Sequence, residues 1–196
     1  MASREWALST RVAARFALAV SLLFALWTQV AGAYTASLVS PSNWLLELRA
    51  APVEIFWNGE ACLVGLAADN GSRQVFQLQG DDLAYVNLVA ALAILAAIPG
   101  LSLRRRAIWG LGVAAVLWAT HVVTLYGGTC AAVSAYLSSA PGSEISLGGF
   151  ALADGGDTLE ELIGRWSAWG SPALILAVSV MAFPRGIWRG AHASGA

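Results

Sequence analysis

Long apolar segments constrain this chain more than any other feature of its sequence. Four stretches, at about 12–33, 84–101, 107–126 and 166–183, are apolar enough to cross a bilayer. A helix that crosses the hydrocarbon core, which is about 30 Å thick, needs about 20 such residues. We therefore expect a mainly α-helical integral membrane protein with four transmembrane helices, forming a single domain over residues 1–196.

The composition supports the membrane class. Hydrophobic residues make up 58% of the chain and charged residues 12%, whereas soluble domains average about 45–50% and about 25%. These departures exclude a disordered chain and argue against an ordinary soluble enzyme. The two cysteines are too few for a disulfide-rich scaffold or for a zinc site built from four cysteines.

The arginines predict how the segments are oriented. All 11 basic residues are arginine, and eight of them lie on one side of the apolar segments: Arg4, Arg11, Arg15, Arg104, Arg105, Arg106, Arg185 and Arg189. The positive-inside rule makes that side cytoplasmic, together with both termini. Two loops, 34–83 and 127–165, then face outward. The cluster of three arginines between the second and third segments acts as a topology anchor, and anionic lipid headgroups are its alternative partners.

The first segment also allows a different interpretation. Arg11 and Arg15 precede an apolar run, and Ala31-Gly32-Ala33 follows it as an A-x-A cleavage pattern. A removable signal peptide has this order of charge, apolar core and small residues. The sequence leaves open whether residues 1–33 are retained as a helix or cleaved.

The first outward loop contains enough pattern to predict structure within it. Ser42-Asn43 can cap a short helix over 44–49, and Trp44 with Arg49 suits a helix lying at the membrane interface. Two apolar runs, 53–57 and 60–66, flank Asn58-Gly59, which is a strong signal for a type I′ hairpin.

A second turn signal, Asn70-Gly71, precedes an alternating run over 73–79. Alternation of polar and apolar residues is typical of a half-buried strand. We therefore expect a small antiparallel three-stranded meander outside the membrane, between the first and second spans. Trp57 belongs either to the core of that meander or to a surface that binds a partner.

The two cysteines lie in the two outward regions. Cys62 falls in the second expected strand, and Cys130 lies just beyond the third span. An oxidising compartment favours a structural disulfide between them. Two free thiols and a redox pair are the alternatives, although the sequence lacks the Cys-x-x-Cys pattern of thiol oxidoreductases.

The third span contains one ionisable side chain, His121, and the second span places Asn87 at a similar depth. Polar residues often join membrane helices through hydrogen bonds, so we expect an intramembrane pair between His121 and Asn87. A catalytic or proton-relay role for His121 is the alternative. One histidine is too few for a metal site, and nothing indicates a cofactor or a nucleic-acid partner.

The order of these parts resembles the small membrane proteins associated with exosortase H. The resemblance covers roughly residues 44–126: the Trp44 segment, the β region, the run ALAILAAIPG at 91–100, the arginine cluster and the span containing His121. It implies a bacterial inner-membrane protein that takes part in the sorting of exported proteins. Exosortases themselves are transpeptidases with an outward cysteine and later Arg and His partners, but Cys62 and Arg165 do not reproduce that pattern, so the catalytic residues are not carried over.

These observations predict an accessory or scaffolding protein without an enzymatic activity of its own, whose partners are membrane lipids and an exosortase or its sorted substrates. The main alternative is a cysteine-dependent membrane peptidase or thiol oxidoreductase that uses Cys62 or Cys130 with His121. A small structural subunit of another membrane complex is the third possibility.

Overall fold

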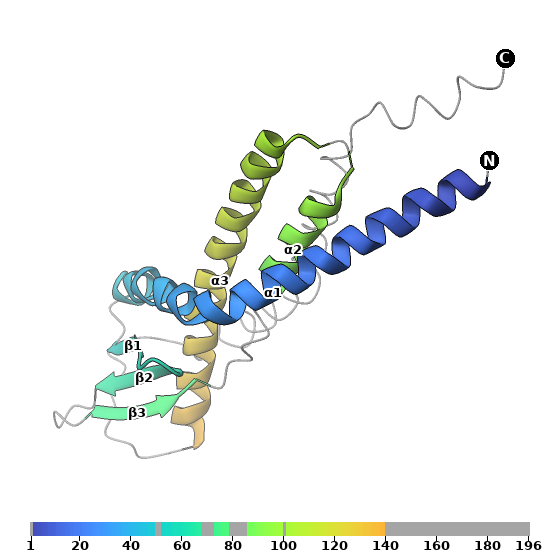
Figure 1. Ribbon diagram of the computed structural model, residues 1–196. Helices are drawn as coiled ribbons and strands as arrows, with labels where there is room; N and C mark the ends of the chain where they lie inside the picture. Colours follow the sequence, from blue (N-terminus) through green and yellow to red (C-terminus); the bar gives the residue numbers. More distant parts are fainter. Residues whose placement is uncertain (1, 50–51, 68–72, 79–85, 100, 140–196) are drawn as a thin grey trace. The chain divides into compact units, whose positions relative to one another are not determined.

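The computed structural model describes residues 2–49, 52–67, 73–78, 86–99 and 101–139 (Figure 1). This part of the chain is mainly helical and contains one small antiparallel sheet. Its elements, in order, are α1 (Ala2–Glu47), β1 (Val53–Trp57), β2 (Cys62–Ala67), β3 (Arg73–Gln77), α2 (Val86–Ala97) and α3 (Leu103–Ser139). The fourth predicted span, 166–183, lies outside the described residues.

The chain divides into two compact units. In the described part, the first unit contains α1 up to Thr28, α2, and α3 up to Leu117. The second unit contains the rest of α1, the three strands, and α3 from Trp118 onward. The functional candidates Cys62, Cys130, His121 and Trp57 all belong to the second unit.

Helix α1 is longer than the predicted first span, because it continues without interruption to Glu47. The prediction of a separate interfacial helix over 44–49 is therefore wrong. The first loop begins after Glu47 rather than at residue 34. The expected cap residue Ser42 lies inside the helix, where its hydroxyl donates a hydrogen bond to the Val122 carbonyl oxygen at 3.2 Å. This contact between helices replaces the local capping contact on which the prediction depended.

Helix α2 is shorter than the predicted second span. It covers 12 residues, or about 18 Å at 1.5 Å per residue, and so falls short of the roughly 20 residues that a crossing helix needs. The predicted span also includes residues 84, 85 and 100, which lie outside the described residues, so its bounds of 84–101 stay a prediction. Pro99 follows the helix, and the residue before a proline is disfavoured in helical conformation. The Arg106 guanidinium then donates to the Ile98 carbonyl oxygen at 2.8 Å, just beyond the helix end.

Helix α3 confirms a helix over the third span and extends it at both ends. It has 37 residues, which corresponds to about 55 Å. Residues 127–139, predicted to open the second outward loop, are its last turns. Apolar side chains continue there at helical spacing, at Tyr126, Cys130, Val133 and Leu137, and the structure packs this face. The helix therefore persists because tertiary packing buries its last turns.

By length and composition, α1 (from Thr10 to Glu47) and α3 (from Leu103 to Leu137) are the two described helices that can cross a membrane. In the most apolar window of α1, 0% of the residues are buried inside the structure, against 33% for α3. Leu18, Leu22 and Leu26 of α1 are 62%, 63% and 57% exposed. Exposed apolar surface of this kind usually contacts a membrane or another protein segment.

The three-stranded meander is confirmed. The strands run antiparallel in the order β1-β2-β3, with Ile55 opposite Val64 and Val64 opposite Phe76. The first turn differs from the expected one by a residue: the Asn58 N–H donates to the Ala61 carbonyl oxygen, so Gly59 and Glu60 are the central residues. Gly59 has φ of +102°, which glycine adopts readily. The second predicted turn, Asn70-Gly71, lies outside the described residues.

One face of the sheet packs on the last turns of α3. Val64 and Leu66 of β2 are 0% exposed and Val133 of α3 is 1% exposed. On the neighbouring strand, the Phe76 ring stacks on Tyr136 with centroids 5.4 Å apart and an angle of 11°. The Tyr136 hydroxyl also donates to the side-chain oxygen of Gln74. An isolated three-stranded sheet is only marginally stable, so this helix face completes its core.

Candidate functional site

Polar side chains meet where the second half of α1 contacts α3. The Tyr34 hydroxyl and His121 Nδ1 lie 2.6 Å apart, and their rings pack edge to face with centroids 5.9 Å apart. His121 is 3% exposed. Which atom donates depends on the tautomer of the imidazole. A buried histidine held in this way is oriented by a residue distant in the sequence.

Two further hydrogen bonds accompany this pair. The Trp118 indole N–H donates to the Ser37 hydroxyl at 3.1 Å, and the buried Ser42 hydroxyl bonds to the backbone of Val122, as described above. We call the three contacts the helix-crossing seam: Tyr34–His121, Ser37–Trp118 and Ser42–Val122. The spacing of three between Tyr34 and Ser37, and between Trp118 and His121, places each pair on one helix face. Sequence analysis missed this seam because it assigned Tyr34 to a loop, although Tyr34, Leu38, Ser42 and Leu46 continue at a spacing of four.

Replacement of Tyr34 tests the strength of the seam. We expect Tyr34→Phe to lower the free energy of unfolding by about 1–3 kcal/mol, because it leaves a buried imidazole nitrogen without this hydrogen bond. Chemical unfolding in detergent measures the loss. In a double-mutant cycle with His121→Phe, the two changes should not be additive. The control Ser37→Ala removes a more exposed contact and should cost less; additive behaviour of Tyr34 and His121 would contradict the contact.

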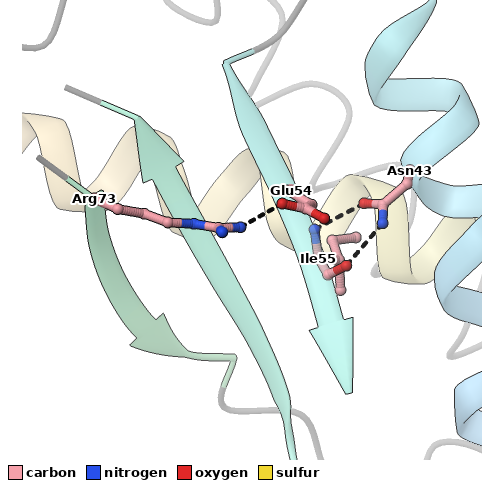
Figure 2. A network of polar contacts seen from close by, with 4 residues as sticks. All are labelled: Asn43, Glu54, Ile55 and Arg73. Carbon is pink, nitrogen blue, oxygen red and sulfur yellow. Dashed lines mark hydrogen bonds and ion pairs between the residues drawn. The ribbon is translucent and has the colours of Figure 1, made fainter. Parts of the chain in front are cut away.

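Asn43 of α1 connects the helix to the sheet (Figure 2). Its side-chain NH2 donates to the Ile55 carbonyl oxygen, and its side-chain oxygen accepts from the Ile55 N–H, each at 2.7 Å. Ile55 is 1% exposed, so these backbone groups would otherwise be buried without partners. The amide group thus pairs with the outer edge of β1 as a neighbouring strand would.

The opposite face of the sheet carries a charged contact that spans all three strands (Figure 2). Arg73 of β3 forms an ion pair with Glu54 of β1, and its guanidinium carbon lies 5.2 Å from the centre of the Phe56 ring. Gly65 of β2 lies under this crossing, and a Cβ atom there would collide with the Arg73 guanidinium as it is placed here. Both charged side chains are about half exposed, so the pair shapes the surface more than it stabilises the fold.

The structure does not test the predicted hydrogen bond between Asn87 and His121. Asn87 belongs to α2 in the first unit and His121 to the second unit, and the pair stays a prediction. The hydrogen-bond partner that the structure gives to His121 is Tyr34. The three arginines of the predicted anchor occupy the first turn of α3; Arg104 and Arg105 are exposed, whereas Arg106 folds back onto the end of α2.

Trp57 lies on the side of the sheet that faces the helices. It shares the face of Ile55, which is buried, since alternate strand residues share a face. A Cβ atom on Gly32 of α1 would lie 3.8 Å from Trp57 Cζ2. Trp57 is half-buried, and these contacts favour its role in the core of the second unit over a role as an exposed docking residue.

The two cysteines are placed along the interface between sheet and helix, but no disulfide joins them in the structure. Cys62 shares the inner face of β2 with Val64, and Cys130 lies one turn before Val133 on α3. Cys130 and His121 are nine residues apart on one helix, hence about 13.5 Å apart along the axis and half a turn out of phase. They cannot form a catalytic dyad, so the cysteine-dependent alternative rests on Cys62.

Thiol labelling distinguishes the states of the cysteines. In the folded, reduced protein we expect a maleimide to react with half-buried Cys62 well before Cys130, which is 2% exposed. If the predicted disulfide forms in the cell, neither thiol reacts until a reductant is added. The single variants Cys62→Ser and Cys130→Ser identify which thiol is labelled. Equal labelling rates for both thiols in the native protein would contradict the burial described here.

Comparison with models of known protein families, with curated proteins and with solved structures found no significant match. Within the described residues, no group of three or more His, Cys, Asp or Glu side chains is arranged to hold a metal ion. The candidate site is therefore defined by its geometry. It consists of the polar contacts between α1 and α3 around His121 and of a sheet held by these two helices. The charged face of that sheet points away from the helices.

Proposed function

We propose that this chain is an accessory or scaffolding protein of the bacterial inner membrane, without an enzymatic activity of its own, that presents a small sheet to a partner in exosortase-type protein sorting. The observation that supports this proposal is the attachment of the sheet. Val64 and Leu66 pack on Val133 of α3, and Asn43 holds the backbone of Ile55. A sheet fixed to two helices is a rigid platform rather than a loose connector.

The membrane setting that we propose has four spans with both termini cytoplasmic. Its support is the long, exposed apolar surface of α1 and the length of α3. At about 55 Å, α3 exceeds the roughly 30 Å hydrocarbon core by about 25 Å. Arg104 and Arg105 begin this helix and the sheet packs near its other end. With the arginines on the cytoplasmic side, the sheet lies outside the membrane on the opposite side.

The surface that we propose for docking is the face of the sheet that points away from α1 and α3. It carries Glu54, Phe56 and Arg73, which form one connected contact across the three strands. Because Gly65 has no side chain, Arg73 lies flat against the sheet and the face presents a charged pair beside an aromatic ring. Such a face selects partners by charge complementarity. We propose this face as the docking surface in place of Trp57, because the Trp57 side chain lies on the face that packs against the helices.

Co-purification from native membranes in mild detergent, followed by mass spectrometry, tests the proposal. We expect an exosortase or its tagged substrates to be recovered with the wild-type chain. The double variant Glu54→Arg, Arg73→Glu keeps an ion pair but reverses its direction, so it should fold and yet lose the partner. Val30→Ala, at an exposed position on α1, is the matched control. Recovery of the chain alone, or of an unrelated stoichiometric complex, would contradict the proposal.

A further inference from the structure

The three arginines at the start of α3 do not share one environment. Arg106 turns back toward α2, where its guanidinium donates to the Ile98 carbonyl oxygen at 2.8 Å. Arg104 and Arg105 are exposed, and within the described residues no ion pair or hydrogen bond is found for either side chain. The cluster therefore divides into one arginine that holds the turn between two helices and two whose positive charges are accessible.

An exposed apolar row follows these two arginines along α3. Ile108 is 59% exposed and Leu111 is 73% exposed, and Gly112 is exposed as well. A Cβ atom added to Gly112 would have no side chain within 4 Å, apart from those of its immediate neighbours in the chain. The row is therefore open at Gly112. The helix thus carries charge in its first turn and accessible apolar surface in the turns that follow.

Helical geometry places this row between the two arginines. At about 100° per residue, Arg105 lies about 100° around the helix axis from Arg104. Ile108 and Gly112 lie about 40° and about 80° from Arg104 in the same direction. Along the axis they follow Arg104 by about 6 Å and about 12 Å. A molecule lying along this face would have a charged end between the two guanidinium groups and an apolar part over Ile108 and Gly112.

We infer that this face binds an anionic phospholipid, with the headgroup phosphate between Arg104 and Arg105 and an acyl chain over Gly112. Guanidinium groups bind phosphate through paired, charge-assisted hydrogen bonds, and basic residues beside the cytoplasmic end of a membrane-crossing helix attract anionic lipids. The apolar row selects a lipid over a free phosphate ion, which would use the arginines alone. The inference rests on the membrane setting of the proposed function but not on the sorting partner, and the site shares no residue with the charged face of the sheet.

Native mass spectrometry of the full chain, purified from membranes in mild detergent and titrated with lipid, tests the charged end of the site. We expect phosphatidylglycerol to be retained in preference to phosphatidylcholine. The double variant Arg104→Gln, Arg105→Gln should weaken this retention about thirtyfold, or about fivefold for each arginine. Arg104→Lys, Arg105→Lys keeps both charges and should keep most of the binding. The matched control Arg11→Gln, Arg15→Gln removes the same charge from exposed positions of α1 and should leave retention unchanged.

A substitution at Gly112 tests the apolar part of the site without altering its charge. Gly112→Leu fills the open position, so we expect it to weaken the retention of phosphatidylglycerol about threefold, because several atom pairs lose their van der Waals contact. Gly128→Leu is the matched control, since Gly128 is an exposed glycine of the same helix with open space where a side chain would be. It lies about 24 Å further along the axis and should leave retention unchanged. Unchanged helical circular dichroism verifies that both variants fold.

Three results would overturn the inference. Phosphatidylglycerol could be retained no better than phosphatidylcholine, or inorganic phosphate could displace it, which would reveal a site for a free anion. Alternatively, Gly112→Leu could retain the lipid as the wild type does, which would show that another segment covers the row. A chain recovered outside the membrane fraction would overturn the membrane setting as well, whereas a membrane-bound chain without lipid preference overturns this inference alone. None of these measurements requires an exosortase, so failure of the sorting role is observed separately.

Discussion

Leu66→Ala is expected to destabilise the docked sheet by about 2–5 kcal/mol, one of the two largest effects expected for this chain. Leu66 is 0% exposed and belongs to the cluster that joins β2 to Val133 of α3. Truncation removes buried methyl groups and leaves a cavity that the short sheet cannot easily close. Because the sheet is too small to persist alone, we expect it to separate from α3 and unfold locally.

Hydrogen–deuterium exchange of the β1, β2 and β3 amides in detergent measures this effect, since exchange reports local opening. The control is Val75→Ala, a truncation on the neighbouring strand at a side chain that is 51% exposed. That variant should change the exchange rates little. If Leu66→Ala left the sheet amides as protected as in the wild type, the sheet would not depend on this core.

Asn43→Leu is expected to produce a loss of similar size, about 2–6 kcal/mol. The leucine is similar in size but cannot pair with the backbone of Ile55, whose N–H and C=O groups would remain buried without these partners. Each such group costs about 1–3 kcal/mol. Equilibrium unfolding in detergent measures the total, and deuterium exchange at the Ile55 amide reports the site directly.

Asn43→Asp separates the two hydrogen bonds. Its carboxylate still accepts from the Ile55 N–H, but an oxygen replaces the group that donated to the Ile55 carbonyl. We expect the Ile55 amide to stay protected while overall stability falls, because two acceptors then face each other. The control Asn58→Asp changes an exposed turn residue whose side chain only accepts hydrogen bonds, so it should be nearly neutral. If Asn43→Leu left the free energy of unfolding unchanged, the backbone groups of Ile55 would not need the hydrogen bonds from Asn43.

The meander was the part of the fold most accessible to sequence analysis. Alternating apolar residues and a glycine-containing turn are local signals, and the structure has all three strands in the expected order. The first turn shifted by one residue because the Asn58 side chain accepts hydrogen bonds from the N–H groups of Glu60 and Ala61. A dipeptide pattern does not reveal which side-chain contact will close a turn.

The ends of the helices were predicted less well. Sequence analysis ended the first helix at residue 33 and the third at residue 126, whereas α1 continues to Glu47 and α3 to Ser139. In both cases the additional turns are less continuously apolar than the spans themselves. They remain helical because Ser42 and Asn43 bond to distant backbone groups, and because Val133 packs under the sheet.

The candidate site, too, was predicted from the sequence only in part. The sequence singles out His121 as the one ionisable side chain of its span, and its pairing with Asn87 stays a prediction. The contact with Tyr34 was not anticipated. Sequence analysis also did not find the Asn43 amide or the crossing of Arg73 over Gly65. These contacts join residues that are between 8 and 87 positions apart, and a single sequence contains no signal for such pairings.

Local sequence signals predict the apolar helices, the short alternating strands, and the clustering of arginines at one end of α3. The ends of the helices, the partner that orients His121 and the side of the sheet that Trp57 faces depend instead on contacts between residues far apart in the sequence. The physical reason is that periodicity depends on neighbouring residues and on burial in general. Caps, edges and buried polar pairs depend on which distant backbone or side-chain group arrives to complete each hydrogen bond.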